Sequence, residues 1–169
     1  MSETQVGTQA SSITTRIVEA VAERARSGDH VRVLGLTGPP GTGKSTIAAQ
    51  LAVALPEAGI AVAGLVPMDG FHMSNALLAE RGLADHKGAP DTFDVGGYVA
   101  MLGRVRRADG IVLAPDYRRD LHEPVAASLA IEVDGVVITE GNYLGLELPG
   151  WADVRGLVDM LIYIDTPFE

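Results

Sequence analysis

Cysteine is absent from the 169-residue sequence. Disulfide bonds, a thiolate nucleophile and a cysteine-ligated zinc site are therefore excluded. Positive charge is also scarce, because 13 lysines and arginines stand against 22 aspartates and glutamates, which gives a formal net charge of −9. An acidic surface attracts neither nucleic acid nor an anionic membrane, so we expect neither as a partner. A phosphate site in this chain has to be local, built from backbone N–H groups and a few basic side chains.

Long apolar runs and a signal-peptide pattern are missing as well. Their absence predicts a cytoplasmic protein. The four histidines do not have the H-x-x-x-H spacing of zinc ligands, which argues against a zinc site. With 47% hydrophobic and 21% charged residues, the composition is that of an ordinary globular protein. We expect a single α/β domain over residues 1–169, with residues 1–10 disordered because they are polar and contain few large apolar side chains.

The most informative stretch is GPPGTGKS, from Gly38 to Ser45. It matches the P-loop pattern G-x-x-x-x-G-K-[ST], and it lies between a run that suits a strand and a run that suits a helix, as the pattern requires. Glycine lets the backbone approach an anion, and N–H groups at the start of the helix point at phosphate oxygens. Lys44 supplies a positive charge for the β- and γ-phosphates, and the Ser45 hydroxyl can bind Mg²⁺. The predicted nucleoside triphosphate site consists of Gly38, Pro39, Pro40, Gly41, Thr42, Gly43, Lys44, Ser45 and Thr46.

Hydrophobic periodicity and breaker residues predict the remaining elements. One helix is expected from Ser11 or Ser12 to about Gly28, packed against the sheet edge, and the helix after the P-loop is expected to stop at Pro56. Strands are expected over residues 31–37, 60–67, 111–114, 129–133, 135–139 and 157–164, and further helices over 74–80 and 95–107. Asp134–Gly135, which separates two strand-like runs, is a hairpin signal.

Two acidic residues follow predicted strands. Asp69 comes directly after the run 60–67, at the carboxyl end where ligands bind in open α/β sheets. It can accept the proton of a substrate hydroxyl or hold Mg²⁺ through water, so Asp69 and Lys44 are the candidate catalytic residues; the alternative is that Asp69 only caps a helix. Glu140 follows the apolar run 136–139 and is similar to a Walker B acid. The predicted magnesium site therefore includes Ser45, Glu140 through water, and Asp69.

Basic and aromatic side chains gather in the loops after strands. The basic ones are His72, Lys87, Arg118, Arg119 and His122. As a set they suit an acceptor or a transferred phosphoryl group, although solvated surface explains each of them alone. Phe71, Phe93 and Tyr117 lie in the same loops, where they either wall an acceptor pocket or serve ordinary packing.

Four further segments follow GPPGTGKS in a fixed order: MDGFHMSN (68–75), KGAPDTFD (87–94), the loop from Pro115, and VVITEGNYL (136–144). Together they resemble the P-loop kinases of the uridine kinase, pantothenate kinase and phosphoribulokinase group. The resemblance is closest to bacterial nucleoside/nucleotide kinase-like members, some of which are named as fructose transport system kinases.

This resemblance implies a P-loop NTPase fold of the α/β class. That fold has a Rossmann-like, three-layer α/β/α arrangement with a mostly parallel sheet and a small β-hairpin insertion. It also implies Asp69 as catalytic base and Glu140 as the Mg²⁺-associated acid. The residues that it carries over to the acceptor site are Lys87, Tyr117, Arg118 and His122, to which we add His72 from its loop position. Members of this group usually continue beyond Asp165 with a helix, an arginine-bearing lid and a further strand, none of which follows here. We therefore expect slow transfer by this chain and a partly uncovered sheet that favours a homodimer.

The sequence predicts an ATP- and Mg²⁺-dependent kinase that transfers the γ-phosphoryl group to a hydroxyl of a small molecule. A sugar, a nucleoside and a pantothenate-like alcohol all offer such a hydroxyl. Two alternatives stay open. One is a nucleotide-binding regulatory module, against which the missing N-K-x-D guanine motif counts. The other is an interaction protein that binds nucleotide with little or no turnover.

Overall fold

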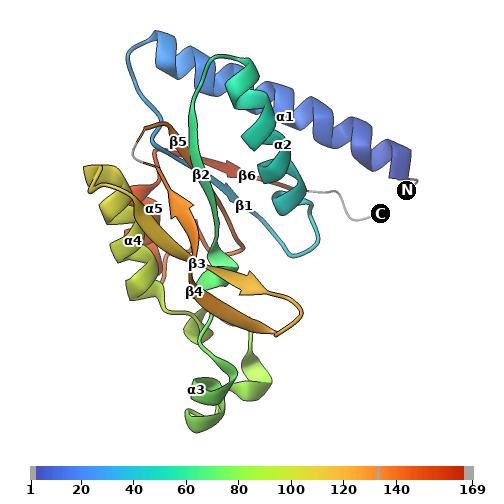
Figure 1. Cartoon of the computed structure of the whole chain (residues 1–169). Coiled ribbons are helices and arrows are strands. Elements are labelled where there is room, and N and C mark those ends of the chain that lie inside the picture. Colours follow the sequence, from blue (N-terminus) through green and yellow to red (C-terminus); the bar gives the residue numbers. More distant parts are fainter. Residues whose placement is uncertain (1–2, 133, 166–169) are drawn as a thin grey trace.

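A four-stranded parallel sheet lies at the centre of the fold (Figure 1). The computed structural model describes residues 3–132 and 134–165, with side chains from Ser12 onward. The strand order is β2-β5-β1-β6. The strands are β1 (Val33–Thr37), β2 (Val62–Pro67), β5 (Val136–Glu140) and β6 (Met160–Tyr163). Because all four strands are parallel, their carboxyl ends meet at one edge of the sheet.

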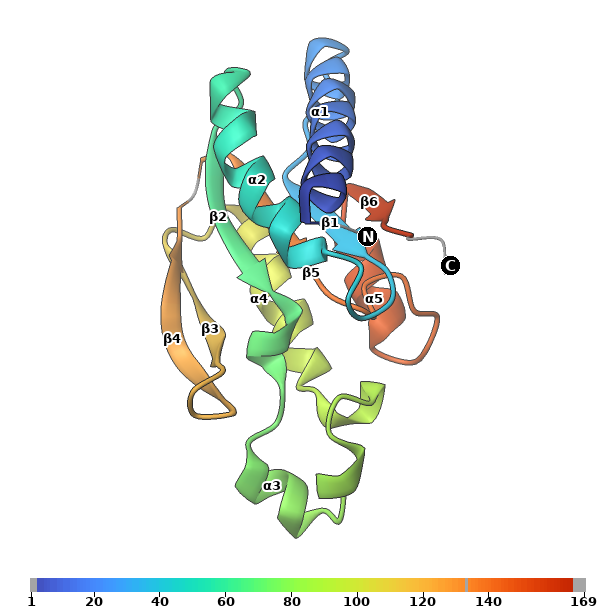
Figure 2. The ribbon, with the colours of Figure 1, turned by 90° about the vertical axis from the view of Figure 1, so that its right-hand side faces the viewer.

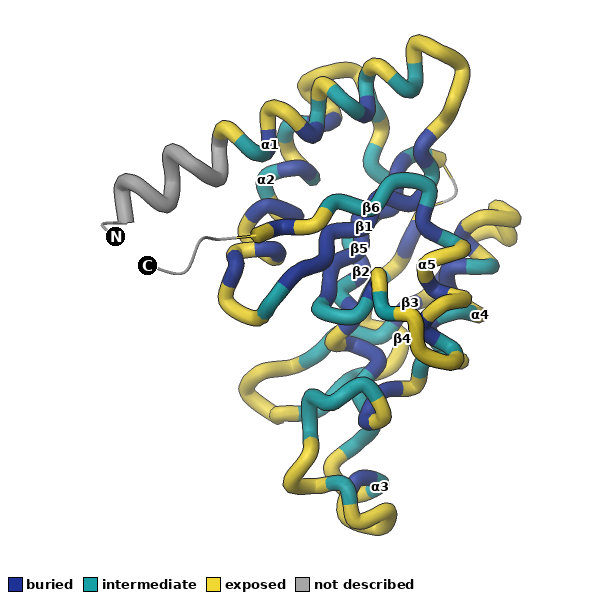
Figure 3. The backbone as a smooth tube through the Cα atoms, turned by 180° about the vertical axis from the view of Figure 1, so that it is seen from behind, coloured by how far each residue is buried: buried dark blue, intermediate teal, exposed yellow. Residues whose placement is uncertain are grey.

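The two central strands are continuous buried runs. Every residue of β1 and of β5 is buried, and Figure 3 shows this as an unbroken dark blue centre. Strands buried on both faces are largely apolar rather than alternating, and VLGLT and VVITE fit this pattern except at Thr37, Thr139 and Glu140. β2 and β6 flank them and are only partly buried. The central pair therefore fixes the base of the P-loop next to Glu140.

Helices cover both faces of the sheet (Figure 2). α1 (Glu3–Arg26) and α2 (Lys44–Glu57) pack on one face through Ile17, Leu51 and Leu55. α4 (Val95–Arg107) and α5 (Trp151–Leu157) pack on the other through Tyr98, Leu102 and Trp151. This three-layer arrangement confirms the α/β/α fold expected from the sequence.

The segment after β2 leads away from the sheet toward the bottom of Figure 1. It begins with the 3₁₀ turn η1 (Met68–Phe71) and α3 (Asn75–Glu80), whose N-cap Ser74 accepts a hydrogen bond from the Leu77 N–H. Two further 3₁₀ turns follow, η2 (Ala84–His86) and η3 (Pro90–Thr92). The predicted helices over 74–80 and 95–107 are confirmed.

A separate antiparallel hairpin packs beside β2. It consists of β3 (Val112–Arg118) and β4 (Glu123–Ile131), and it is the β-hairpin insertion that the resemblance implied. For this hairpin the sequence predicted strands only over 111–114 and 129–133, with a loop from Pro115. Proline carries no N–H for a ladder, and the pairing is irregular between Ala114 and Asp116, yet the strand continues past it.

The hairpin expected at Asp134–Gly135 is wrong. β4 pairs with β3, whereas β5 pairs in parallel with β1 and β2, so the dipeptide joins two different sheets. The buried run of β5 obtains its hydrogen bonds from β1 and β2, and this pairing overrides the local turn signal. The predicted end of the preceding strand at Val133 lies outside the described residues.

Two helix boundaries and one whole helix also differ from expectation. α1 begins at Glu3, not at Ser11 or Ser12, because no proline interrupts the segment; Met1 and Ser2 lie outside the described residues. α2 continues through Pro56 to Glu57, since a proline in the last turn removes only one terminal bond. α5 was not predicted, and Leu157, which was expected to begin the strand 157–164, is instead the last residue of this helix. No helix in the described part of the chain has the length and apolar character needed to cross a membrane.

Candidate active site

The P-loop has the backbone conformation that its glycines permit. Gly38, Gly41 and Gly43 have φ angles of 146°, 79° and 81°, a region that side chains with a Cβ atom rarely enter. A Cβ atom on Gly38 would also collide with the carbonyl oxygen of Ile164. The chain turns directly from β1 into α2, whose first-turn N–H groups have no partner within the helix. This end of α2 is therefore suited to an anion.

Lys44 lies folded against the P-loop backbone. Its side chain is buried, with the residue only 7% exposed, and Nζ donates hydrogen bonds to the carbonyl oxygens of Gly38 at 2.9 Å and Pro39 at 2.7 Å. Burial lowers the pKa of Lys44, while the charges of Glu140 and Asp69 oppose this shift. No carboxylate of the described residues forms an ion pair with Nζ. A phosphate oxygen would supply the missing counter-charge, so the site fits the triphosphate predicted from the sequence.

Ser45 and Glu140 are in direct contact across the sheet edge. The Ser45 hydroxyl donates a hydrogen bond of 3.0 Å to Glu140 Oε1. Glu140 ends β5 and is 8% exposed. Burial raises the pKa of Glu140, and the hydrogen bond from Ser45 partly offsets this rise. One hydroxyl and one carboxylate are oxygen ligands of the kind that Mg²⁺ takes together with phosphates and water.

Asp69 lies in η1, immediately after β2, with its side chain 55% exposed. It lines the same cavity as the P-loop, Ser45 and Glu140. This P-loop cavity has a volume of about 390 Å³ and is lined by Pro40, Gly41, Gly43, Lys44, Ser45, Thr46, Asp69, Arg119, Glu140, Gly141 and Asn142. The structure thus brings together both candidate catalytic residues and all three candidate magnesium ligands.

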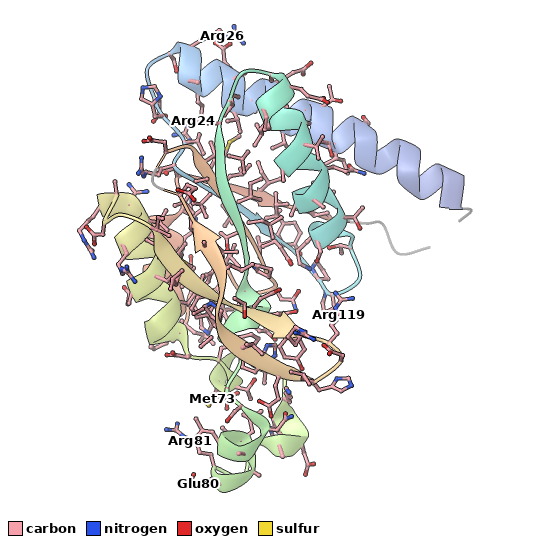
Figure 4. All side chains as sticks on the ribbon, in the orientation of Figure 1. Arg24, Arg26, Met73, Glu80, Arg81 and Arg119 are labelled. Atoms are coloured by element: carbon pink, nitrogen blue, oxygen red, sulfur yellow. The ribbon has the colours of Figure 1, made fainter. Side chains whose placement is uncertain are left out.

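Arg119 is the cation that the hairpin contributes to the P-loop cavity. Nothing in the sequence separates Arg119 from Arg118, and the resemblance carried over Arg118, not Arg119, to the acceptor site. In the structure Arg118 lies outside this cavity, bound to both carboxylate oxygens of Asp120 at 2.9 and 2.7 Å. Figure 4 shows Arg119 between the hairpin and the P-loop.

A second group of predicted residues forms an aromatic–lysine cluster of His72, Phe93, Tyr117 and Lys87. The His72 ring lies 4.0 Å from the Phe93 ring and 5.2 Å from the Tyr117 ring, measured between centroids. Lys87 Nζ lies 5.3 Å from the centroid of Tyr117. His72 connects the cluster to the candidate base, because its Nδ1 lies 3.9 Å from Asp69 Oδ1. This arrangement suits an acceptor pocket next to the P-loop cavity.

The remaining predicted acceptor residues take other positions. His122 has a positive φ of 51° in the hairpin turn, and its carbonyl oxygen accepts hydrogen bonds from Lys87 Nζ at 2.7 Å and Asn75 Nδ2 at 3.1 Å. The backbone of His122 therefore holds the cluster together. Phe71 is buried and packs on Tyr98 with ring centroids 4.7 Å apart. For Phe71 the packing interpretation is therefore correct.

A buried hydrogen-bond chain behind the site was not predicted from the sequence. The Tyr98 hydroxyl lies 2.5 Å from Thr139 Oγ1, and Thr139 Oγ1 donates to the Val66 carbonyl at 2.7 Å. Thr139 directly precedes Glu140, and Val66 lies three residues before Asp69. The helical periodicity of residues 95–107 places Tyr98 inward, but nothing local indicates its partner 41 positions away.

Fold and site together define a P-loop nucleotide-binding protein of the kinase type. The chain is 38% identical over 140 residues to the uncharacterized protein YggC of Escherichia coli K12, covering 81% of this chain and 57% of that protein. It is 30% identical to a pantothenate kinase of Limosilactobacillus reuteri, covering 79% of this chain and 45% of that enzyme. The crystal structure of a candidate fructose transport system kinase from Silicibacter sp. TM1040 matches with a TM-score of 0.83 and 36% identity, over 91% of this chain and 75% of that one.

The chain belongs to the P-loop kinases of the uridine kinase and pantothenate kinase group. The chain spans about half the length of the curated relatives that it matches. A family model described as methylmalonyl Co-A mutase-associated GTPase MeaB also matches residues 3–81, which include the P-loop but make up less than half of the chain.

Proposed function

We propose that this P-loop kinase uses ATP and Mg²⁺ to phosphorylate a hydroxyl group of a small molecule. The observation that carries the proposal is the convergence of Lys44, the Ser45–Glu140 pair and Asp69 on one cavity of about 390 Å³. Phosphoryl transfer requires mainly positioning and charge stabilisation, and these groups can supply both.

The donor phosphates would be bound by the P-loop. Backbone N–H groups at the start of α2 would donate to phosphate oxygens, and Lys44 would turn from the Gly38 and Pro39 carbonyls toward the γ-phosphate. Ser45, with Glu140 acting through water, would hold Mg²⁺, which neutralises phosphate charge when it is bound. ATP is a substrate in this scheme.

Asp69 would act as general base. Its carboxylate is partly exposed in the cavity, where an acceptor hydroxyl can reach it. As the hydroxyl oxygen forms its bond to the γ-phosphorus, Asp69 would take the hydroxyl proton. The bond between the γ-phosphorus and the β–γ bridging oxygen would break, and ADP would leave with that electron pair.

The acceptor would lie against the aromatic–lysine cluster. Tyr117 and His72 offer ring faces, and Lys87 offers a positive charge held between Asn75 Oδ1 and the His122 carbonyl. A sugar, a nucleoside or a pantothenate-like alcohol combines hydroxyl groups with a body that can contact these rings.

A second candidate function is a nucleotide-dependent regulatory module with little turnover. The match of residues 3–81 to the MeaB GTPase model favours it. Residues 1–169 contain no N-K-x-D guanine motif, and such a module gives no role to Asp69 beside the aromatic–lysine cluster.

The test is transfer of labelled γ-phosphate from ATP to a panel of sugars, nucleosides and pantothenate-like alcohols. We expect one acceptor class to be phosphorylated, with ATP preferred over GTP and no transfer by Lys44→Ala. Nucleotide binding with GTP preferred, and without transfer to any acceptor, would support the regulatory module instead.

A further inference from the structure

Arg119 carries an unpaired positive charge at the P-loop cavity. Its side chain makes no hydrogen bond and no ion pair with any other residue that the structure describes. It nevertheless lines the cavity with Lys44, Asp69 and Glu140, and its charge lowers the pKa of Glu140 against the larger effect of burial. In an acidic protein, a cation kept free at such a position is available to an anionic ligand.

Arg118, the preceding residue, shows the opposite arrangement. It forms two hydrogen bonds to Asp120 and does not line the cavity. The two neighbouring arginines thus separate into one that is bound to a carboxylate of its own turn and one that faces the P-loop. Among the described residues, Asp120 forms an ion pair with Arg118 and none with Arg119.

The hairpin that carries Arg119 is anchored close to the candidate base. A Cβ atom on Gly70, next to Asp69, would collide with the carbonyl oxygen of Pro115 in β3, so the hairpin backbone touches η1 directly. Glu123 in β4 accepts a hydrogen bond of 2.9 Å from the Asn75 N–H. These contacts on both strands hold the hairpin beside the cavity. They therefore also fix the backbone position of Arg119.

We propose that Arg119 is a catalytic residue that binds the oxygens of the transferred γ-phosphoryl group. This inference rests on the proposed kinase function. A guanidinium presents a planar fork of N–H donors that matches phosphate oxygens in a bidentate manner. As the phosphorus–oxygen bond to the acceptor forms and the bond to the leaving ADP breaks, Arg119 stabilises the negative charge on the phosphoryl oxygens. The hydroxyl proton passes to Asp69, so Arg119 transfers no proton.

The first experiment needs no acceptor. Calorimetry with the full chain compares the affinities for a non-hydrolysable triphosphate analogue and for ADP, both with Mg²⁺. For Arg119→Ala we expect the triphosphate affinity to fall about tenfold or more, because charged hydrogen bonds are lost, while the ADP affinity stays unchanged. Arg119→Lys should keep part of the triphosphate affinity, since it keeps the charge but not the fork. Arg118→Ala is the matched control and should retain the parental ratio of triphosphate to ADP affinity.

The second experiment measures turnover with the acceptor found in the panel. Arginines that stabilise this transition state in other P-loop enzymes contribute about 10³–10⁵-fold in rate, so Arg119→Ala should reduce kcat by about 10³-fold with an unchanged melting temperature. Equal loss of triphosphate and ADP affinity, or no loss of either, would overturn the assignment. If the parent phosphorylates nothing, the proposed function fails, but the binding comparison still decides whether Arg119 contacts the γ-phosphate.

Discussion

The buried chain of Tyr98, Thr139 and Val66 makes a quantitative prediction about stability. Thr139 has one hydroxyl proton, which it donates to the Val66 carbonyl oxygen; a carbonyl can only accept. The Tyr98 hydroxyl must therefore donate to Thr139 Oγ1. Tyr98 is 0% exposed, so no water can replace a lost partner from the surface. Because of this direction, removing the Tyr98 hydroxyl and removing the Thr139 hydroxyl should cost different amounts of stability.

Tyr98→Phe removes only the outer donor and leaves the bond from Thr139 to Val66 in place. We expect a loss of about 0.5–1.5 kcal/mol in the free energy of unfolding, the net value of one hydrogen bond. Thr139→Val removes the central group and leaves the Tyr98 hydroxyl and the Val66 carbonyl without this partner. Each buried unsatisfied group costs about 1–3 kcal/mol, so the loss should be about 2–6 kcal/mol.

The double variant tests the reasoning. In the Thr139→Val background, Tyr98→Phe removes an orphaned hydroxyl, so it should restore stability rather than reduce it further. Urea unfolding of the four proteins, with unchanged m-values, measures these differences. Additive losses in the double variant, or a smaller loss in Thr139→Val than in Tyr98→Phe, would refute the assigned chain of donors.

Three further predictions concern single groups. Lys44→Ala should weaken binding of the ATP analogue about 10- to 100-fold, because it removes a charged hydrogen-bond donor. If calorimetry gives the variant the same affinity as the parent, the P-loop assignment is refuted. Asp69→Asn should keep ATP affinity and lose about 10²–10⁴-fold in transfer rate, and a parental rate would show that the base lies elsewhere. Asp159 is partly buried, which raises its pKa, but hydrogen bonds from Arg106 and from the Val33 and Arg32 N–H groups more than offset this, so its pKa lies below the usual value. Its stabilisation is therefore present above the unfolded pKa of about 3.9 and is lost as the pH falls through the folded pKa; Asp159→Asn should cost about 1.5–3 kcal/mol at pH 7, and the difference from the parent should shrink in acid unfolding curves.

The P-loop part of the candidate site could be predicted from the sequence because the residues that form it are adjacent in the chain. The P-loop glycines, Lys44 and Ser45 are consecutive, and their conformation follows from residue type. Asp69 and Glu140 could be predicted because both follow apolar runs that become parallel strands, and parallel strands end at one edge. No long-range contact has to be known for either inference.

The hairpin and the aromatic–lysine cluster could not be predicted to the same depth because they depend on contacts between distant segments. Pro115 and the alanines of β4 give no strand signal in the sequence. The two strands form because they pair with each other and pack beside β2. Arg118 and Arg119 are equivalent in the sequence, and only the turn at Asp120 separates them. The false hairpin at Asp134–Gly135 has the same origin, because pairing with β1 and β2 decides where β5 lies.

The division between sheet and hairpin has a consequence for how such a protein can change its substrate. The groups expected to bind the donor phosphates come from β1, α2 and β5, which are held by the core, whereas Tyr117 and the backbone of His122 come from a ribbon outside the central sheet. A substitution in that ribbon can change the contacts proposed for the acceptor without disturbing the packing beneath the P-loop. Arg119 lies on the same ribbon and lines the P-loop cavity, so under the proposed mechanism any such exchange must also keep a cation at this cavity. If the hairpin contacts the acceptor as proposed, acceptor specificity can therefore change only through hairpin substitutions that leave Arg119 at the P-loop cavity.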